Sequence, residues 1–194
     1  MIRLALLRHG HTTWNREGRV QGRSDIPLDA YAVQELGALR LPTPWDSADL
    51  WSSPLERAAH TARLVGGHAP KTDAALMEMN WGDWEGRKAA ELRSDPSCDH
   101  RDIETWGWHY TPPNGESPAA LHARLLPWVA QRKTNTVAVC HIGVMRVLMA
   151  HATGWNFDGL APFAVKRNRL FVIEIRGNDW TLLPDSIRLE SRPP

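Results

Sequence analysis

Short apolar runs that alternate with helix-like segments are the feature that most constrains the fold of this 194-residue chain. Residues 2–7 (IRLALL) form an almost continuous apolar run, which is typical of a strand buried on both faces of a sheet. We expect further strands at 49–52 and 136–140, and a C-terminal hairpin from 170–175 and 179–183. Strands separated by helices predict an α/β fold with a mostly parallel central sheet and helices on both faces.

Helix signals lie between these strands. Two helices are expected to begin after the N-cap residues Asp29 and Ser117. Residues 53–56 (SPLE) have the pattern of a capping box, and the helix that follows is expected to end at Gly66-Gly67. A further helix is expected over roughly residues 143–153, directly after the third strand.

The length of the chain suits a single domain, residues 1–194, with an ample core. Residues 87–116 are polar and contain Trp106 and Trp108, and only residues 87–94 suggest a short helix. We therefore expect a lid-like excursion at 87–116 that carries the substrate specificity, with its tryptophans and His109 closing over the substrate.

Composition excludes several classes of protein. The formal net charge is only +1, which argues against binding to nucleic acid or to a membrane surface. The chain has no apolar run near the roughly 18 residues that a membrane span needs, and Met1 is not followed by a signal-peptide pattern. The two cysteines, Cys98 and Cys140, have no metal-site spacing. These features favour a soluble, cytoplasmic protein.

Polar residues of unusual type follow three of the predicted strands. Arg8 and His9 follow the first strand, Arg57 lies in the first turn of the helix after the second, and His141 follows the third. Ligands of parallel α/β sheets bind beyond the carboxyl ends of the strands, so we expect these four side chains to meet. Together they would form a pocket for an anion the size of phosphate, in which one neutral histidine acts as a nucleophile.

Phosphoryl transfer also needs an acid for the leaving oxygen, and the stretch LMEMNWGDWEG holds the candidates. Glu78 is favoured because Trp81 and Trp84 could supply apolar walls that raise the pKa of a carboxyl group. Asp83 and Glu85 are rivals on spacing alone, and the residues by themselves do not decide among the three.

No metal ion or other cofactor is expected. His11, His60 and His68 form no HxxxH pattern with a matching carboxylate.

Six stretches are similar, in order along the chain, to motifs of the histidine phosphatase superfamily, also called the cofactor-dependent phosphoglycerate mutase-like family. They are LLRHG, TTWN, SSPLERAAHTA, LMEMNWGDWEG, PPNGES and VAVCHIGVMR. The resemblance implies a three-layer α/β/α sandwich and a covalent phosphohistidine intermediate formed without a metal ion. It also implies a small phosphorylated metabolite as substrate and inorganic phosphate as product.

Carried over position by position, the resemblance implies that His9 is the nucleophile and Glu78 the proton donor. Arg8, Arg57 and His141 would bind the phosphoryl group. Asn15 matches the asparagine of the family's WN pair, so the resemblance implies a further phosphate contact there. To these we add four more residues expected to bind substrate: Thr12, Gln21, Gly22 and Ile142.

The compact GDWEG form lacks the insertion typical of mutases and indicates the phosphatase branch of this family. LERAAHTARLV, EMNWGDWE, PPNGES and the C-terminal hairpin are particularly similar to α-ribazole phosphatases. His11 and Ile142 depart from the common pattern, in which an acidic residue and a glycine are usual. Both departures concern substrate preference, not the reaction class.

We therefore expect a metal-independent phosphomonoesterase, with α-ribazole phosphate as a candidate substrate. One alternative is a phosphoglycerate mutase. Another is a catalytically silent module that binds a phosphorylated ligand, which the retained nucleophile and acid disfavour. A homodimer is allowed, but the sequence does not specify an oligomeric state.

Overall fold

The fold is a mixed β-sheet covered by helices, and the computed structural model describes it for residues 1–193. Within these residues seven strands form the main sheet in the order β4-β3-β5-β1-β6-β7, with β8 beside β6. The strands are β1 (Ile2–Arg8), β3 (Asp49–Ser52), β4 (Lys71–Thr72), β5 (Thr136–Cys140), β6 (Arg169–Arg176), β7 (Asp179–Leu182) and β8 (Ile187–Arg188). A separate pair consists of β2 (Leu39–Arg40) and β9 (Glu190–Ser191).

The sheet has a parallel half and an antiparallel half. β4, β3, β5 and β1 are parallel to one another, whereas β6 runs antiparallel to β1, β7 and β8. The sheet predicted as mostly parallel is therefore a mixed one. The antiparallel half contains the predicted hairpin, in which Gly177, with a φ of 62°, allows the tight reversal between β6 and β7.

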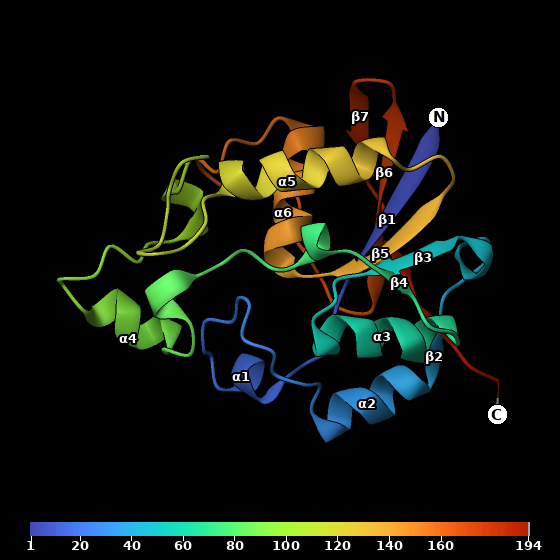
Figure 1. The fold of residues 1–194 in the computed structure, drawn as a ribbon, viewed down its shortest axis with the longest axis horizontal. Coiled ribbons are helices and arrows are strands. Elements are labelled where there is room, and N and C mark those ends of the chain that lie inside the picture. Colours follow the sequence, from blue (N-terminus) through green and yellow to red (C-terminus); the bar gives the residue numbers. More distant parts are fainter. Residues whose placement is uncertain (194) are drawn as a thin grey trace.

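Helices cover both faces of the sheet, which confirms the predicted α/β/α sandwich (Figure 1). They are α1 (Thr13–Arg16), α2 (Ala30–Gly37), α3 (Glu56–Gly66), α4 (Ala89–Ser94), α5 (Pro118–Ala130) and α6 (Ile142–Thr153). Leu4 and Leu6 of β1 pack on the side of α5 and α6, and Ala5 and Leu7 pack on the side of α2 and α3. In residues 1–193, none of the helices has the length and apolar character needed to cross a bilayer.

Two predicted helix starts are confirmed and one is wrong. The Asp29 carboxylate and the Ser117 hydroxyl cap α2 and α5 by accepting backbone N–H bonds of 2.8 and 3.1 Å. The expected capping box at Ser53 does not form, because α3 begins only at Glu56. The Ser53 hydroxyl instead accepts from the N–H of Leu55 at 3.2 Å, within the turn that leads from β3 into the helix.

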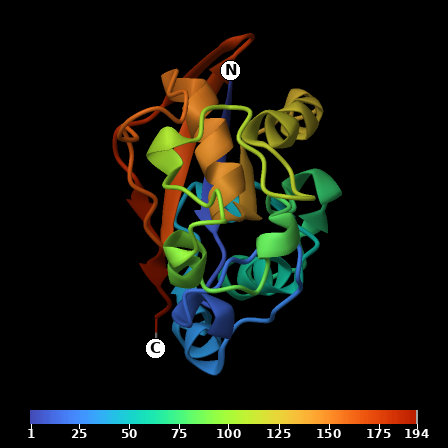
Figure 2. The same cartoon turned by 90° about the vertical axis from the view of Figure 1, so that its left-hand side faces the viewer.

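Residues 87–116 lie across the end of the molecule toward which β1 and β5 run (Figure 2). The short helix predicted at 87–94 is α4, and a single 3-10 turn, Ile103–Thr105, follows it. The remainder of the segment is irregular, and eight of its residues line the cavity described below.

Candidate active site

The two histidines predicted at strand ends lie side by side. β1 and β5 are parallel neighbours, paired up to Arg8 and Cys140, and the backbone N–H of His9 donates to the Cys140 carbonyl at 3.0 Å. The rings of His9 and His141 consequently meet, with their centroids 5.1 Å apart. Both residues are buried. The sheet itself therefore sets their relative position.

The His9 ring is held as one neutral tautomer. Its Nδ1 lies 2.6 Å from the Gly10 carbonyl oxygen, which can only accept, so Nδ1 carries the proton and Nε2 keeps its lone pair. Burial lowers the pKa of His9 well below its usual value, and the electrostatic interactions with His141 and Arg57 lower it further. A neutral imidazole with a free Nε2 can act as a nucleophile toward phosphorus.

Arg57 lies near enough to both histidines to lower their pKa values, and it does not line the cavity. It is the second residue of α3, in the first turn as predicted, and it is wholly buried. Its guanidinium donates to the carbonyl oxygens of Gly22 and Ser24 at 2.5 and 2.8 Å. Gly22, which was predicted to bind substrate, thus supplies a backbone acceptor for Arg57. Burial lowers the pKa of Arg57, while Glu78 opposes that shift.

Glu78 has a buried carboxyl group whose two oxygens accept backbone hydrogen bonds. Oε1 accepts from the N–H of Met79 at 2.8 Å, and Oε2 accepts from that of Gly143 at 3.1 Å. Burial raises the pKa of Glu78 despite these bonds and the charges of Arg57 and Arg8. A Cβ at position 143 would lie 2.3 Å from Oε1, so only glycine allows this approach. A carboxyl group with a raised pKa can deliver a proton to a leaving oxygen.

The geometry separates Glu78 from its two rivals. The exposed carboxylate of Asp83 accepts from the Asn114 side-chain amide at 3.0 and 3.2 Å. Burial opposes ionisation of Glu85, but hydrogen bonds from Ser24 and Arg23 outweigh it and lower the pKa of Glu85. Both carboxylates hold loops together, and of the three only Glu78 lines the cavity.

A cavity of about 380 Å³ opens beside His9. Six of the predicted site residues line it: Arg8, His9, Asn15, Gln21, Glu78 and Ile142. The other four are buried and do not line it: Thr12, Gly22, Arg57 and His141.

The segment 87–116 forms much of the remaining wall, as expected for a lid-like excursion. His109, however, is exposed and does not line the cavity, so its contact with substrate stays a prediction. His100 lines the cavity instead. A single sequence offers no way to choose between these two histidines, because the segment between them is irregular.

The tryptophans divide between the cavity and the core. Trp81 and Trp106 line the cavity and make an edge-to-face contact with ring centroids 5.2 Å apart. Trp84, predicted as a wall beside Glu78, is buried instead in a separate cluster with Leu92 and Tyr110. Trp84 contacts the cavity-lining residues Trp81 and His100, with ring centroids 6.4 and 5.1 Å apart, but does not itself line the cavity.

Asn15 and Gln21 reach the cavity through a small amide network. Thr12 Oγ1 and Asn15 Nδ2 both donate to Gln21 Oε1, at 3.0 and 2.9 Å. Gln21 therefore presents Nε2, a buried donor, on its remaining side. Thr12 is wholly buried and caps α1, so it orients Gln21 rather than contacting the cavity.

Buried polar atoms that lack a hydrogen-bond partner concentrate at this site. Residues 1–193 contain seven such side-chain atoms, of which five belong to predicted site residues. These are Nε of Arg8, Nε2 of Gln21, Nε of Arg57, Nδ1 of His141 and Nε2 of His141. Each unsatisfied buried group costs about 1–3 kcal/mol. An anion that accepts from several of them would remove that cost.

Two cationic residues were missed by the sequence analysis. Arg167 donates to the His9 carbonyl and to Asn15 Oδ1, the latter at 3.0 Å, and burial lowers its pKa to about 9. Arg146 lines the cavity from α6, and burial lowers its pKa. Arg146 follows Ile142 by one helical turn, so helical periodicity could have found it. Arg167 precedes β6 in a loop, where no local pattern marks it.

The site carries more positive than negative charge. Arg8, Arg57 and Arg146 interact electrostatically with Glu78, and Arg167 interacts with Arg8, while both histidines are neutral. Throughout the part of the chain that the structure describes, no group of three or more His, Cys, Asp or Glu side chains is placed to hold a metal ion. These features define an α/β protein that can hold a phosphate-like anion against a neutral histidine at the ends of parallel strands.

A family model described as the histidine phosphatase superfamily (branch 1) matches residues 4–184. The chain belongs to that superfamily, and it is an enzyme of that family, with a phosphorylated substrate. The match covers both strand-end histidines and the cavity wall.

Relatives within the family include phosphatases and mutases. The chain is 32% identical to an adenosylcobalamin/α-ribazole phosphatase of Escherichia coli, over 93% of this chain and 94% of that protein. It is 28% identical to a 2,3-bisphosphoglycerate-dependent phosphoglycerate mutase of Cytophaga hutchinsonii, over 76% of each. A crystal structure of phosphoglycerate mutase from Thermus thermophilus aligns with a TM-score of 0.74 and 32% identity, covering 97% of this chain and 100% of the other.

Proposed function

We propose that this chain is a metal-independent phosphomonoesterase that acts on a small phosphorylated metabolite through a phosphohistidine at His9. The observation that carries the proposal is the cluster of five unpartnered buried polar atoms on Arg8, Gln21, Arg57 and His141. Three of these atoms are donors on Arg8, Gln21 and Arg57. The other two are the ring nitrogens of His141, one of which donates in the neutral ring. Four of the five atoms can therefore donate to phosphoryl oxygens.

The first chemical step transfers the phosphoryl group to His9. Nε2 attacks phosphorus, the bond between phosphorus and the ester oxygen breaks, and the Glu78 carboxyl gives its proton to the departing oxygen. The Nδ1 proton stays on the ring, where the Gly10 carbonyl stabilises the positive charge that develops. Arg8 and Arg57 offset the charge on the equatorial oxygens.

The second step releases inorganic phosphate. Glu78, now a carboxylate, takes a proton from a water molecule as that water attacks phosphorus. The bond to Nε2 breaks, His9 returns to its neutral form, and Glu78 is again protonated. Each group ends the cycle as it began, so no metal ion or other cofactor is required.

Within this class, we propose α-ribazole phosphate as a candidate substrate. The E. coli relative carries that activity in its name. The apolar wall of Trp81, Ile103 and Trp106 suits a substrate with an aromatic or otherwise flat apolar part. Ile142, at a position where glycine is common in the family, also lines the cavity, and its larger side chain narrows the space beside this wall. It is therefore a further determinant of substrate preference.

A phosphoglycerate mutase is the second candidate, because relatives of that activity match the chain and share its fold. In a mutase, a second substrate hydroxyl would take the phosphoryl group from His9 before water does. Inorganic phosphate would then stay low while an isomeric phosphoester accumulates.

We further propose that residues 1–194 act as one domain in which residues 87–116 form a lid over the cavity. The contribution of eight residues of that segment to the wall supports this view. A cytoplasmic location and a homodimer stay predictions.

The experiment that tests the function measures phosphate release from a panel of about a hundred phosphomonoesters in the presence of EDTA. The wild type is compared with His9→Ala and with the control His68→Ala, which replaces an exposed histidine outside the site. We expect release from the wild type and the control, none from His9→Ala, and a covalent phosphoryl adduct that mass spectrometry places on His9. Tight binding without turnover or adduct would instead support a silent binding module, and loss of activity on chelation would overturn the metal-independent mechanism.

A further inference from the structure

The segment that carries Glu78 has no regular secondary structure. It lies between the 3-10 turns Ala74–Leu76 and Gly82–Trp84, and residues 77–81 belong to no helix or strand. The sheet positions His9, but it does not position a carboxyl group on such a segment. Some other set of bonds must hold it.

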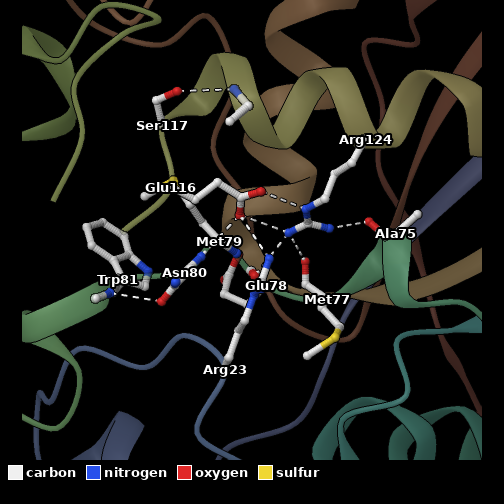
Figure 3. A network of polar contacts seen from close by, with 12 residues as sticks. Arg23, Ala75, Met77, Glu78, Met79, Asn80, Trp81, Glu116, Ser117 and Arg124 are labelled. Atoms are coloured by element: carbon white, nitrogen blue, oxygen red, sulfur yellow. Dashed lines mark hydrogen bonds and ion pairs between the residues drawn. The ribbon is translucent and has the colours of Figure 1, made fainter. Parts of the chain in front are cut away.

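Arg124, on α5, makes those bonds (Figure 3). Its guanidinium donates to the carbonyl oxygens of Ala75, Met77 and Glu78, the last two at 2.7 and 3.1 Å. One side chain thus fixes three carbonyl groups of the segment, including that of Glu78 itself. A guanidinium can do this because its five N–H donors lie in one rigid plane.

Glu116 completes the arrangement from the other side. Its carboxylate accepts from Arg124 Nε at 2.8 Å and from Nη2 at 3.1 Å, and it also accepts from the N–H of Asn80 at 3.2 Å. The N–H of Glu116 in turn donates to the Asn80 carbonyl at 2.8 Å. Both side chains of the ion pair are largely shielded from water, with exposed fractions of 21% and 12%. The pair therefore braces the backbone on both sides of Glu78 (Figure 3).

We propose that Arg124 and Glu116 are positioning residues, which hold the Glu78 carboxyl where it can protonate the leaving oxygen. This inference rests on the proposed function, because it takes Glu78 as the acid. Neither residue lines the cavity, so neither contacts the substrate. They act through the backbone of residues 77–80, while the N–H groups of Met79 and Gly143 orient the carboxyl group itself.

The dependence of kcat/KM on the basicity of the leaving group distinguishes a positioning role from a merely structural one, because loss of stability alone does not change this dependence. A displaced acid slows the departure of a basic leaving group and has little effect on one that departs without a proton. Phenyl phosphate and p-nitrophenyl phosphate have similar shapes but differ in the basicity of the departing phenolate. The ratio of their kcat/KM values isolates this step, because kcat/KM covers the reaction only up to departure of the alcohol.

The experiment compares Arg124→Lys and Glu116→Gln with Glu78→Gln. Lysine cannot reach three carbonyl groups as the planar guanidinium does. We expect Arg124→Lys to lose about 10–100-fold in kcat/KM for phenyl phosphate and less than about threefold for p-nitrophenyl phosphate. Glu116→Gln should show the same pattern at roughly tenfold, and Glu78→Gln should show it most strongly, at about 10²–10⁴-fold.

Matched controls exist for both substitutions. Arg132→Gln replaces a partly buried arginine that bonds the Trp128 carbonyl at the end of α5, away from the site. Glu174→Gln replaces a carboxylate of 16% exposure that pairs with Arg3 at 2.7 Å. Neither control should change the ratio between the two substrates, even where it lowers stability.

The outcomes separate this proposal from the proposed function. Equal losses for both substrates in Arg124→Lys and Glu116→Gln, beside a leaving-group effect in Glu78→Gln, would overturn the positioning role alone. The absence of a leaving-group effect in Glu78→Gln would overturn the acid assignment and the positioning role with it. If Arg124→Lys does not fold, Glu116→Gln against Glu174→Gln decides the question.

Discussion

The two halves of the candidate site are built by different means. His9 and His141 stand at the ends of neighbouring parallel strands, and Arg57 stands at the start of the helix that follows β3. The opposite half consists of residues 77–86 and 87–116, which are largely irregular. Most groups proposed for the chemistry thus lie on the rigid part. Groups proposed to meet the rest of the substrate lie on a part whose sequence can change without disturbing the sheet.

Glu78 is the exception, because it is proposed for the chemistry but lies on the irregular side. That is also where additional bonds concentrate: Arg124 holds the backbone, and the N–H of Gly143 reaches Glu78 from α6. The comparison shows that a loop can hold a reactive group in place when hydrogen bonds from neighbouring helices, here α5 and α6, fix its position.

The largest effect is expected where the rigid half touches Glu78. A Cβ at Gly143 would lie 2.3 Å from Glu78 Oε1, so Gly143→Ala should push the carboxyl group away and lower kcat by about 10²-fold. Alanine is the better helix former, so the melting temperature should not fall by more than a few degrees. Steady-state kinetics and thermal unfolding of the same variant check both parts.

Gly37→Ala is the matched control, since Gly37 also lies in a helix but a Cβ there meets nothing within 4 Å. If Gly143→Ala keeps full activity, then contact with α6 does not determine the position of the acid.

The sequence predicted the rigid half well and the irregular half poorly, for a physical reason. Pairing of β1 with β5 in parallel obliges His9 and His141 to meet, and an apolar run followed by a polar residue marks both strand ends in the sequence. Arg124 and Arg167 donate hydrogen bonds to backbone carbonyl groups that are distant in the sequence, and no local sequence pattern predicts such contacts. The same limit applies to Trp84, which is buried in a core cluster with Leu92 and Tyr110.

The buried histidines should make stability depend on pH. Both His9 and His141 have a pKa lowered well below the usual value, mainly by burial. Below about pH 6.5 the unfolded chain therefore binds more protons than the folded one, so the stability is fully present above that pH and is lost as the pH falls. Each histidine contributes up to about 1.4 kcal/mol per pH unit, a factor of ten in the folding equilibrium.

Denaturant unfolding between pH 7.5 and pH 5 measures this slope. His141→Asn should flatten it, because asparagine does not titrate, whereas His68→Asn, which replaces an exposed histidine, should leave it unchanged. A slope that is the same in all three proteins would mean that His141 binds protons equally in the folded and unfolded states.

Arg146 should affect binding more than chemistry. It lines the cavity from α6, in the rigid half, and adds positive charge without being proposed to handle a proton. Arg146→Gln should raise KM by about tenfold and change kcat by less than about threefold, as expected for an interaction present in both ground and transition states. Arg169→Gln, on β6 and bonded to Ser186, is the control. A fall in kcat without a change in KM would instead place Arg146 at the transferring phosphoryl group.

The smallest effects are expected in the segment 87–116, and they should concern preference rather than rate. Trp106 lines the cavity, so Trp106→Leu should lower kcat/KM for aromatic phosphomonoesters about three- to fivefold relative to small aliphatic ones, because it removes a flat apolar surface. His109→Ala should leave that ratio unchanged, because His109 is exposed. If His109→Ala changes the ratio as strongly as Trp106→Leu does, then the segment closes farther over the substrate than this structure shows. The irregular half would then be a moving lid, and its residues could not be assigned to specificity from their positions in the open cavity alone.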